Sequence, residues 1–401
     1  MTSSLEPPAA DGAALFRRHV FLFSVATFFY WAGLYLYMPI FSVHAKSLGA
    51  SLSMVGVIVA AYAIPQVLFR IPLGILFDSV RRRKSLIAAG ILMTSAGALG
   101  LGLAPGPWTL FGARIVTGVG AAAWVAFAVY FAAYYPETAA PRAIGIINFV
   151  QGAAIVVATY GGGMVAQKLG DRSAFYGAAV LGLVALGAHL AAREPAVATR
   201  VRRISRADLT AVARYWPLII VSLMGVLSQF ANWAGLFGFV PVYAARIGAD
   251  SSDLGLITMA SLAASALASL LTMRLVRATG SLVSIVLGAV LLGGTMVFVP
   301  GMHSLPALIG LMLVNGIGRG LIQTLLMSLS VQSIPAPLRA TAMGVYQAIY
   351  AVGMLSGPLV TGLLADRLGL DRAFYVAAGG CLVLAGMAFL PALRAPAAFT
   401  R

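Results

Sequence analysis

Two arginines stand well inside long apolar stretches, where a guanidinium group meets little water. Arg114 follows Leu110-Phe-Gly-Ala, and Arg319 follows Asn315-Gly-Ile-Gly. Ionisable side chains inside such stretches are costly and usually mark a functional site. Both arginines are therefore candidates for binding an anionic group, although Arg114 could instead brace helix ends. We expect the third such arginine, Arg70, to extend its head group to the nearby surface and to serve structure.

Carboxylates are absent from the middle of these stretches. The eleven acidic residues lie in termini, loops or stretch ends: Glu6, Asp11, Asp78, Glu137, Asp171, Glu194, Asp208, Asp250, Asp253, Asp366 and Asp371. The four histidines lie in similar places. No nucleophile with a neighbouring base, no zinc-type spacing and no phosphate-binding glycine loop occurs. The sequence therefore predicts neither an enzyme nor a metal site, requires no cofactor, and demonstrates no proton-carrying group at mid-membrane.

Uncharged side chains that could hold a ligand are gathered in the same apolar stretches. They are aromatic or carboxamide residues: Tyr30, Trp31, Tyr35, Trp124, Gln229, Asn232, Trp233, Asn315 and Gln323, with Asn148, Gln151, Tyr346, Gln347 and Tyr350 on neighbouring stretches. Ligand sites are mostly apolar with a few placed polar groups, so this set fits an amphipathic or sugar-like substrate. The alternative is ordinary helix packing, which accounts for many aromatic stripes.

The composition places these stretches in a membrane. Of the 401 residues, 61% are hydrophobic and only 9% are charged, whereas soluble domains carry about 25% charged residues. The net charge of +16 raises the possibility of nucleic-acid binding. However, the basic residues are scattered between apolar stretches, which is the usual pattern of helix ends in membranes. The single cysteine, Cys381, excludes an intrachain disulfide.

Twelve apolar stretches are long enough to cross a bilayer, whose core takes about 20 helical residues. They predict an all-α membrane protein with twelve transmembrane helices, near residues 20–43, 53–77, 85–103, 107–133, 143–167, 173–192, 215–244, 253–273, 282–299, 307–332, 340–364 and 373–391. With the N-terminus inside, the cytoplasmic segments hold eighteen of the 27 Lys and Arg residues and the external loops hold six. This excess predicts that both termini are cytoplasmic.

The two halves of the chain resemble each other. Three segment pairs match: Trp31-Ala-Gly-Leu-Tyr-Leu-Tyr-Met-Pro39 with Trp233-Ala-Gly-Leu-Phe-Gly-Phe-Val-Pro241, Thr117-Gly-Val-Gly120 with Asn315-Gly-Ile-Gly318, and Asp171-Arg172-Ser-Ala-Phe-Tyr176 with Asp371-Arg372-Ala-Phe-Tyr375. We expect two pseudo-symmetric six-helix bundles, 1–192 and 215–401, joined by a cytoplasmic linker, 193–214. Parallel repeats of this kind place a substrate site at their interface near the midplane.

A short loop between the second and third stretches carries a distinctive motif, Gly74-Ile-Leu-Phe-Asp78-Ser-Val-Arg81-Arg82-Arg83-Lys84. It resembles the signature loop of the major facilitator superfamily, with Arg81 in place of the usual second glycine. The stretch around Arg114 resembles that family's fourth-helix motif, and Pro136-Glu137 followed by Arg142 resembles its next loop. The resemblance covers essentially the whole chain and is to bacterial twelve-helix transporters of the drug- or sugar-efflux kind.

The resemblance implies that the first, fourth, seventh and tenth helices line a central cavity opened alternately to each side. In the cytoplasmic loops we expect a gate made by Gly74, Asp78, Arg81, Arg82, Glu137 and Arg142, in which carboxylates and arginines pair when that side is closed. The alternative is that these charges only set the orientation of the chain.

The leading functional prediction is a monomeric secondary transporter in the bacterial inner membrane. It would export a small amphipathic or drug-like molecule, with proton antiport as one form of coupling. The stretch Gly353-Met-Leu-Ser-Gly357-Pro358-Leu-Val-Thr-Gly362 resembles an exporter motif, but close helix packing explains it equally well. The alternatives are an organic-anion or sugar exchanger or facilitator, in which Arg114 and Arg319 would bind the anion, and a lipid or lysolipid flippase.

Overall fold

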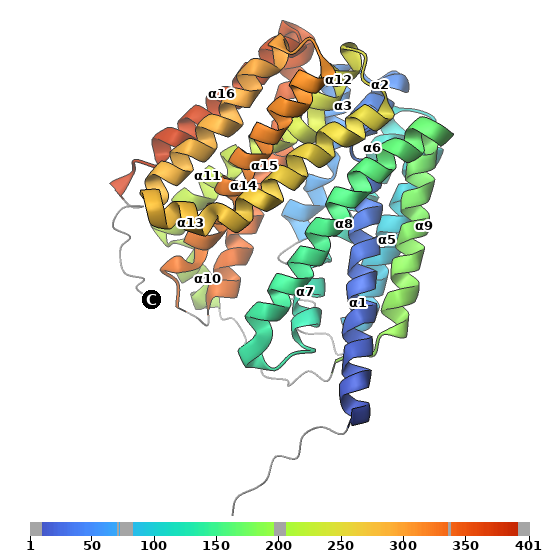
Figure 1. Cartoon of the computed structure of the whole chain (residues 1–401), viewed down its shortest axis with the longest axis vertical. Helices are drawn as coiled ribbons and strands as arrows, with labels where there is room; N and C mark the ends of the chain where they lie inside the picture. Colours follow the sequence, from blue (N-terminus) through green and yellow to red (C-terminus); the bar gives the residue numbers. More distant parts are fainter. Residues whose placement is uncertain (1–9, 70–71, 73–82, 196–205, 336–337, 392–401) are drawn as a thin grey trace, which may run out of the picture.

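A computed structural model describes residues 10–69, 72, 83–195, 206–335 and 338–391. The described residues form helices joined by short turns (Figure 1). The N-terminal half holds α1 (Ala10–Leu36), α2 (Phe41–Ser47), α3 (Leu52–Ala61), α5 (Arg83–Leu103), α6 (Pro107–Ala121), α7 (Trp124–Ala132), η1 (Glu137–Ala139), α8 (Ala140–Leu169) and α9 (Asp171–Ala191). The rest holds α10 (Arg206–Ala213), α11 (Trp216–Ala234), η2 (Gly235–Phe239), α12 (Val240–Arg246), α13 (Ser251–Phe298), η3 (Val299–Gly301), α14 (Leu305–Gln332), α15 (Arg339–Leu368) and α16 (Leu370–Met387).

Eleven helical stretches of the described chain are long and apolar enough to cross a membrane. One of them, Ser251–Gly301, contains both predicted spans 253–273 and 282–299. Gly280 divides it, because its φ of 83° and ψ of 164° interrupt the helix. Figure 1 shows α13 turning back on itself at its lower left end, so that its two parts run in opposite directions. The predicted fold class, an all-α membrane protein, is confirmed.

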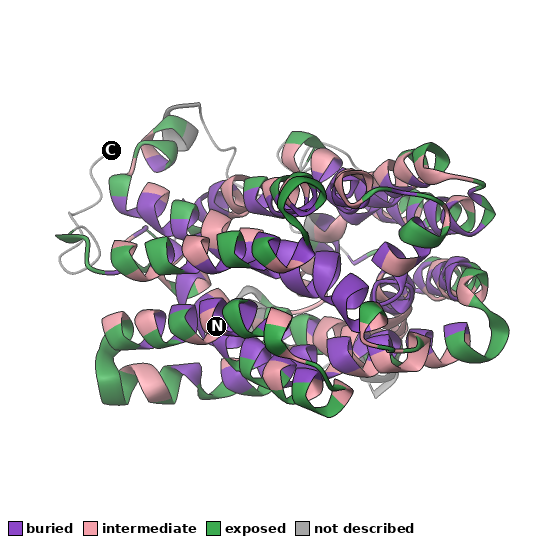
Figure 2. Cartoon of the chain, turned by 90° about the horizontal axis from the view of Figure 1, so that it is seen from above, coloured by how far each residue is buried: buried purple, intermediate pink, exposed green. Residues whose placement is uncertain are grey.

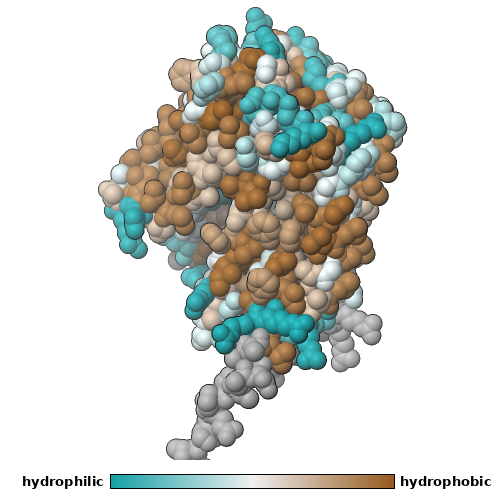
Figure 3. Space-filling view, turned by 45° about the vertical axis from the view of Figure 1, so that its right-hand side comes forward, coloured by the Kyte–Doolittle hydropathy of each residue, from teal (hydrophilic) through white to brown (hydrophobic). Residues whose placement is uncertain are grey.

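The outer surface suits lipid. Large apolar side chains such as Leu270, Leu382 and Phe149 are 69–78% exposed, and exposed residues follow the outward faces of the helices (Figure 2). Figure 3 shows mainly hydrophobic side chains at mid-height and hydrophilic side chains toward the two ends. A soluble protein rarely exposes so much contiguous apolar surface, because water would drive it to associate.

Proline interrupts the first and seventh predicted spans at matching places. The first span breaks after Leu36, before Pro39, and the seventh passes through the π-helix η2 before Pro241. Because proline has no N–H, the carbonyl four residues earlier loses its helical partner. At Pro241 that carbonyl belongs to Phe237, and it accepts a hydrogen bond from the Ser42 hydroxyl of the other half at 3.2 Å. The break therefore provides a contact between the halves.

The halves meet through two equivalent pairs of glycines. A Cβ added to Gly163 would lie 2.9 Å from the Gly255 Cα, and one added to Gly56 would lie 3.3 Å from the Gly362 Cα. Small residues let helix backbones approach this closely in a membrane. The first pair joins α8 to α13 and the second joins α3 to α15, as expected for two pseudo-symmetric bundles.

These contacts close one end of the molecule, which we call the distal end; α1 begins at the opposite, proximal end. At the distal end Asp366 accepts hydrogen bonds from the backbone N–H groups of Leu52 and Ser53, at 3.1 and 2.8 Å. In the matching place Gln167 accepts one from the N–H of Ser251, at 3.2 Å. All hydrogen bonds between the halves that the described residues make lie on the distal side. In Figure 1 the two sets of helices converge toward the top and diverge toward α7 and α10.

Candidate binding site between the two halves

A run of aromatic rings crosses from one half to the other just inside the distal closure. On the N-terminal side Trp31 lies 5.0 Å from Trp124 and 5.8 Å from Tyr35, between ring centroids. Tyr35 meets Phe237 of the other half edge-on at 5.8 Å. Phe237 in turn lies 5.2 Å from Trp233. Edge-on and offset ring contacts are favourable beyond the area that they bury, so this run helps to seal the distal side.

A second aromatic contact joins the halves. Tyr62 stacks on Trp233 with a centroid distance of 5.4 Å and an interplanar angle of 18°. Tyr62 was not among the predicted site residues, because a single tyrosine in an apolar stretch carries no signal of its own. Tyr62 stands at the C-terminal end of helix α3, and only the structure shows that its ring meets the other half.

Three carboxamides form a chain in the C-terminal half. Asn232 donates to the Gln229 side-chain oxygen at 3.3 Å, and Gln229 donates to the Gln323 oxygen at 3.2 Å. Gln229 and Asn232 are three residues apart on α11, so they share a face, as do Arg319 and Gln323 four apart on α14. The sequence prediction had named all four residues, and the structure brings them together.

Arg319 lies beside this amide chain and the aromatic run. Its guanidinium carbon is 5.9 Å from the Phe237 ring centroid. The side chain is half-buried, and its Nη1 atom finds no hydrogen-bond partner in the described part of the chain. Asn232 Oδ1 and Trp31 Nε1 are also buried and unpartnered there. The site therefore has polar atoms left over to bind a ligand.

Arg114 lies in a different environment. It is 1% exposed, and its Nη1 atom donates to the Tyr37 hydroxyl at 2.7 Å. The guanidinium also lies over the rings of Phe41 and Tyr62, at 4.7 and 4.6 Å. Cation–π contacts of this kind hold a guanidinium without a carboxylate. The structure therefore places Arg114 in the packing of the N-terminal bundle, where its hydrogen bond and ring contacts occupy it.

Two other predicted residues also lie in helix packing. The Tyr30 hydroxyl donates to the Gly120 carbonyl at 2.9 Å, which ties α1 to α6. Asn315 donates to Thr295 at 2.8 Å, which ties α14 to the second part of α13. Both side chains are 1% exposed, so a ligand cannot reach them in this conformation.

The remaining predicted residues lie on α8 and α15. Tyr346 is buried against Tyr350 with a centroid distance of 5.2 Å, whereas Gln347 and Tyr350 are half-buried. Asn148 is exposed and Gln151 is half-buried. None of these five residues is joined to the amide chain by a hydrogen bond among the described residues.

The predicted cytoplasmic gate falls mostly outside the described residues. This applies to Gly74, Asp78, Arg81 and Arg82, and to the side chain of Glu137. Arg142 is described and exposed near the start of α8. Its pairing with a carboxylate stays a prediction.

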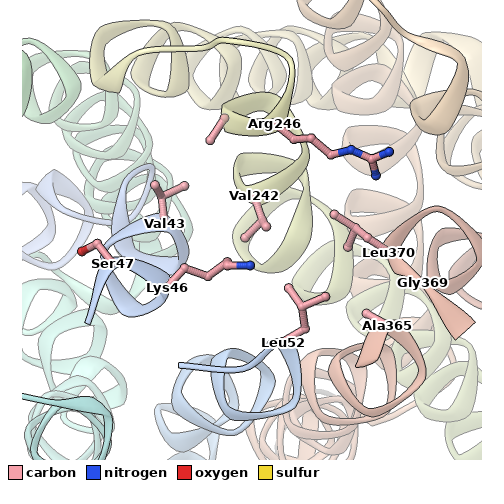
Figure 4. A pocket seen from close by; sticks show the side chains of 10 residues that line it. Val43, Lys46, Ser47, Leu52, Val242, Arg246, Ala365, Gly369 and Leu370 are labelled. Carbon is pink, nitrogen blue, oxygen red and sulfur yellow. The ribbon is translucent and has the colours of Figure 1, made fainter. Parts of the chain in front are cut away.

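The distal end contains a pocket of about 610 Å³ that sequence reasoning did not find. Both halves line it, with Lys46 and Leu52 on one side and Val242, Arg246 and Leu370 on the other. Figure 4 shows Lys46 extending across the pocket while Arg246 points away from it. The Arg246 Nη1 atom forms an ion pair with the Asp371 Oδ1 atom at 3.1 Å, which explains why the Arg246 side chain points away from the pocket. No cluster of His, Cys, Asp and Glu able to hold a metal occurs among the residues that the structure describes.

The sequence profile of the Major Facilitator Superfamily matches residues 23–248 and 221–401, which together span most of the chain. The chain belongs to the major facilitator superfamily. This membership confirms the resemblance that the loop and helix motifs indicated. It also explains the two similar bundles with their interface site, because transporters of this superfamily are built from two such repeats.

Related superfamily members have diverse or unknown cargo. An uncharacterized transporter of this type from Methanocaldococcus jannaschii is 23% identical over 390 residues, which cover 93% of this chain and 98% of the relative. The inner membrane transport protein YajR of Escherichia coli is 28% identical over 150 residues, 37% of this chain and 33% of YajR.

Solved structures show the same fold. A bacterial homologue of the human lysosomal transporter Spinster, in an inward-facing, unoccupied conformation, has a TM-score of 0.79 at 16% identity, covering 98% of this chain and all of that one. A mutant of the nucleoside transporter NupG has a TM-score of 0.76 at 15% identity, and the match covers 93% of this chain and 98% of the NupG chain. These likenesses establish the superfamily fold and leave the substrate open.

Proposed function

We propose that this protein is a secondary transporter that moves a small amphipathic molecule across the membrane by alternating access. The observation that carries the proposal is the site between the halves, where an aromatic run and an amide chain meet beneath the distal closure. A mostly apolar surface with a few free polar atoms is suited to an amphipathic ligand. Because the hydrogen bonds between the halves that the described residues make all lie on the distal side, a ligand would reach the site from the proximal side.

We propose that the proximal end faces the cytoplasm of a bacterial cell, with both termini on that side of the plasma membrane. The threefold excess of Lys and Arg in the proximal segments supports this orientation. The chain would then cross the bilayer twelve times, with α13 counted twice because of Gly280. The moving units would be 1–192 and 215–401, and 193–214 would link them within a monomer.

In this orientation the protein would load its cargo from the cytoplasm and release it outside, which corresponds to export. On release, the distal contacts would break and the proximal side would close through the gate residues, including Asp78 and Arg142. Proton antiport would have to use groups other than a mid-span carboxylate, since the sequence has none.

A thermal-shift screen of the purified protein identifies compounds that bind, and flux in proteoliposomes then tests transport. We expect a stabilising compound to accumulate in inside-out vesicles that contain the protein and not in empty vesicles. An imposed pH gradient would raise this accumulation only if protons are exchanged. Failure of every stabilising compound to move would overturn the proposed function.

A further inference from the structure

Arg319 differs from Arg114, the other described arginine of the membrane interior, in making no hydrogen bond within the described part of the chain. Arg114 donates to Tyr37 and lies over the rings of Phe41 and Tyr62, with only its Nε atom unpartnered, whereas Arg319 makes a single cation–π contact, with Phe237. The ion pairs of the described residues do not include Arg319, and all carboxylates of the sequence lie at span ends or beyond. A positive charge held in a protein interior without a partner is strongly unfavourable.

Arg319 also has no counterpart in the other half. The match of Thr117-Gly-Val-Gly120 with Asn315-Gly-Ile-Gly318 places Ala121 opposite Arg319. Arg319 is therefore not part of the symmetric packing that both bundles need. A costly charge at one of two equivalent places indicates a role in binding.

The groups around Arg319 complete an anion site. Gln323, one turn further along α14, uses its oxygen to accept from Gln229, which leaves its amide nitrogen free to donate. The free Nη1 of Arg319 and this nitrogen lie on the same helix face. Guanidinium and amide donors together match the oxygens of a carboxylate or a phosphate.

The opposite side of the site is aromatic. Trp31, Tyr35 and Trp124 of the N-terminal half and Phe237 of the C-terminal half form connected ring contacts. Rings of this kind bind a flat or apolar body by stacking and burial. The polar donors thus come from the C-terminal half and most of the aromatic surface comes from the N-terminal half, so that both halves converge on one ligand.

We propose that the cargo is an amphipathic organic anion whose acidic head group is bound by Arg319 and Gln323, while its apolar body lies on the aromatic run. This inference rests on the proposed function and narrows its substrate class. The ligand supplies the counter-charge that the protein lacks, and the two halves bind its two ends. A carboxylate or phosphate on a soluble molecule and one on a lysolipid present the same chemistry to Arg319.

Tryptophan fluorescence tests the proposal, because Trp31, Trp124 and Trp233 all lie in the site. Purified protein is titrated with 2-naphthoate and with its neutral analogue 2-naphthamide. We expect naphthoate to bind roughly tenfold or more tightly, as a hydrogen bond to a charged group contributes that much. In Arg319→Gln the affinities for naphthoate and naphthamide should become equal, and in Arg319→Lys part of the preference for naphthoate should remain. The control is Arg277→Gln, which changes an exposed arginine on α13 and should leave the preference for naphthoate unchanged.

A stability measurement separates binding from a merely structural role. Removing an unpaired interior charge should leave the melting temperature of ligand-free Arg319→Gln equal to or above that of the wild type. Naphthoate should then raise the melting temperature of the wild type more than naphthamide does, and the two compounds should raise that of Arg319→Gln equally. A fall in the melting temperature of ligand-free Arg319→Gln and Arg319→Lys together would overturn the proposal.

Competition identifies the source of the head group. If 1-oleoyl lysophosphatidate displaces naphthoate more strongly than short aromatic acids do, the natural cargo is a lipid. If short aromatic acids displace it more strongly, the cargo is a soluble acid. Both outcomes support the anion site. If wild-type protein binds and transports neutral compounds without preferring naphthoate, the inference fails and the proposed function stands. If it transports no compound of any charge, both fail.

Discussion

Two arginines with similar sequence surroundings have different neighbours in this structure. Arg114 donates to a tyrosine hydroxyl and lies over two rings, whereas Arg319 makes no hydrogen bond within the described part of the chain. The sequence showed that both charges lie inside apolar stretches. It did not show that Tyr37 and Phe41, which follow the helical part of the first span, fold back onto Arg114. Long-range contacts of this kind leave no local pattern.

Substitution of Arg114 should therefore reduce stability. Arg114→Met replaces the guanidinium with a shorter apolar side chain, which removes the partner of the buried Tyr37 hydroxyl and the cation over two rings. We expect a loss of about 1–3 kcal/mol in the free energy of unfolding, measured as a lower melting temperature in detergent. Equal melting temperatures for Arg114→Met and the wild type would show that the enclosure contributes nothing.

The N-terminus of α13 supplies a test of pH dependence. Asp250 accepts from the backbone N–H of Asp253 at 2.8 Å, and this hydrogen bond, followed by one from Ser252, lowers the pKa of its carboxyl group. A lowered folded-state pKa stabilises the protein above the unfolded value of about 3.9, and this contribution is lost as pH falls through the folded value.

Asp250→Ala should accordingly lower stability by about 1 kcal/mol at pH 7, while Asp250→Asn retains most of the cap. Melting curves between pH 3 and pH 7 measure the effect. The difference between wild type and Asp250→Ala should be constant down to about pH 5 and shrink only in acid. A difference that grows as the pH falls would contradict this assignment of the cap.

At the scale of helices, the distal closure depends on glycine. Gly163→Leu places a side chain where the Gly255 backbone lies, so α8 and α13 cannot approach. We expect the variant to stay open at the distal end, with labelling of an engineered Ser251→Cys increased several-fold. The matched control is Gly152→Leu on the same helix, where an added Cβ meets nothing within 4 Å. Equal labelling of the two variants would argue against a glycine seal.

The two halves hold the distal helix starts with unequal strength. Asp366 accepts from two backbone N–H groups at the N-terminus of α3 with a carboxylate. At the N-terminus of α13 the backbone N–H of Ser251 donates to the neutral amide of Gln167, and the carboxylate of Asp171 accepts only from the Ser251 hydroxyl. A carboxylate gains from the partial positive charge of a helix N-terminus. Asp366→Ala should therefore favour the distally open state more than Gln167→Ala does, and Asp366→Asn should be intermediate. Accessibility of Ser51→Cys from outside measures this order, and a larger effect of Gln167→Ala would contradict it.

Much of the helical arrangement was predictable, because apolar length and repeated motifs report directly on membrane spans. The breaks inside the spans were harder to predict from the sequence. Pro39 and Pro241 mark two of them, but only the structure shows that the carbonyl freed by Pro241 accepts a bond from Ser42. The long α13 hides two spans because only Gly280 separates them. The amide cluster was predicted as a set of residues, while the ring run through Phe237 and Tyr62 was not.

At the scale of the whole molecule, the structure is one state of the proposed transport cycle. The distal end is closed by backbone contacts, and the site with Arg319 is placed beneath that closure. Transport requires a second state in which the distal contacts open and the proximal ends of the two bundles meet.

The central claim, that the two bundles rock about a site between them, is tested most directly by distances between spin labels. One pair joins the distal ends at Lys46 and Arg246, and the other joins the proximal ends at Arg142 and Gln332, with each residue changed to cysteine. On addition of a transported ligand we expect the distal distance to lengthen and the proximal distance to shorten in the same sample. If ligand leaves both distances unchanged, or moves them in the same direction, the account is contradicted.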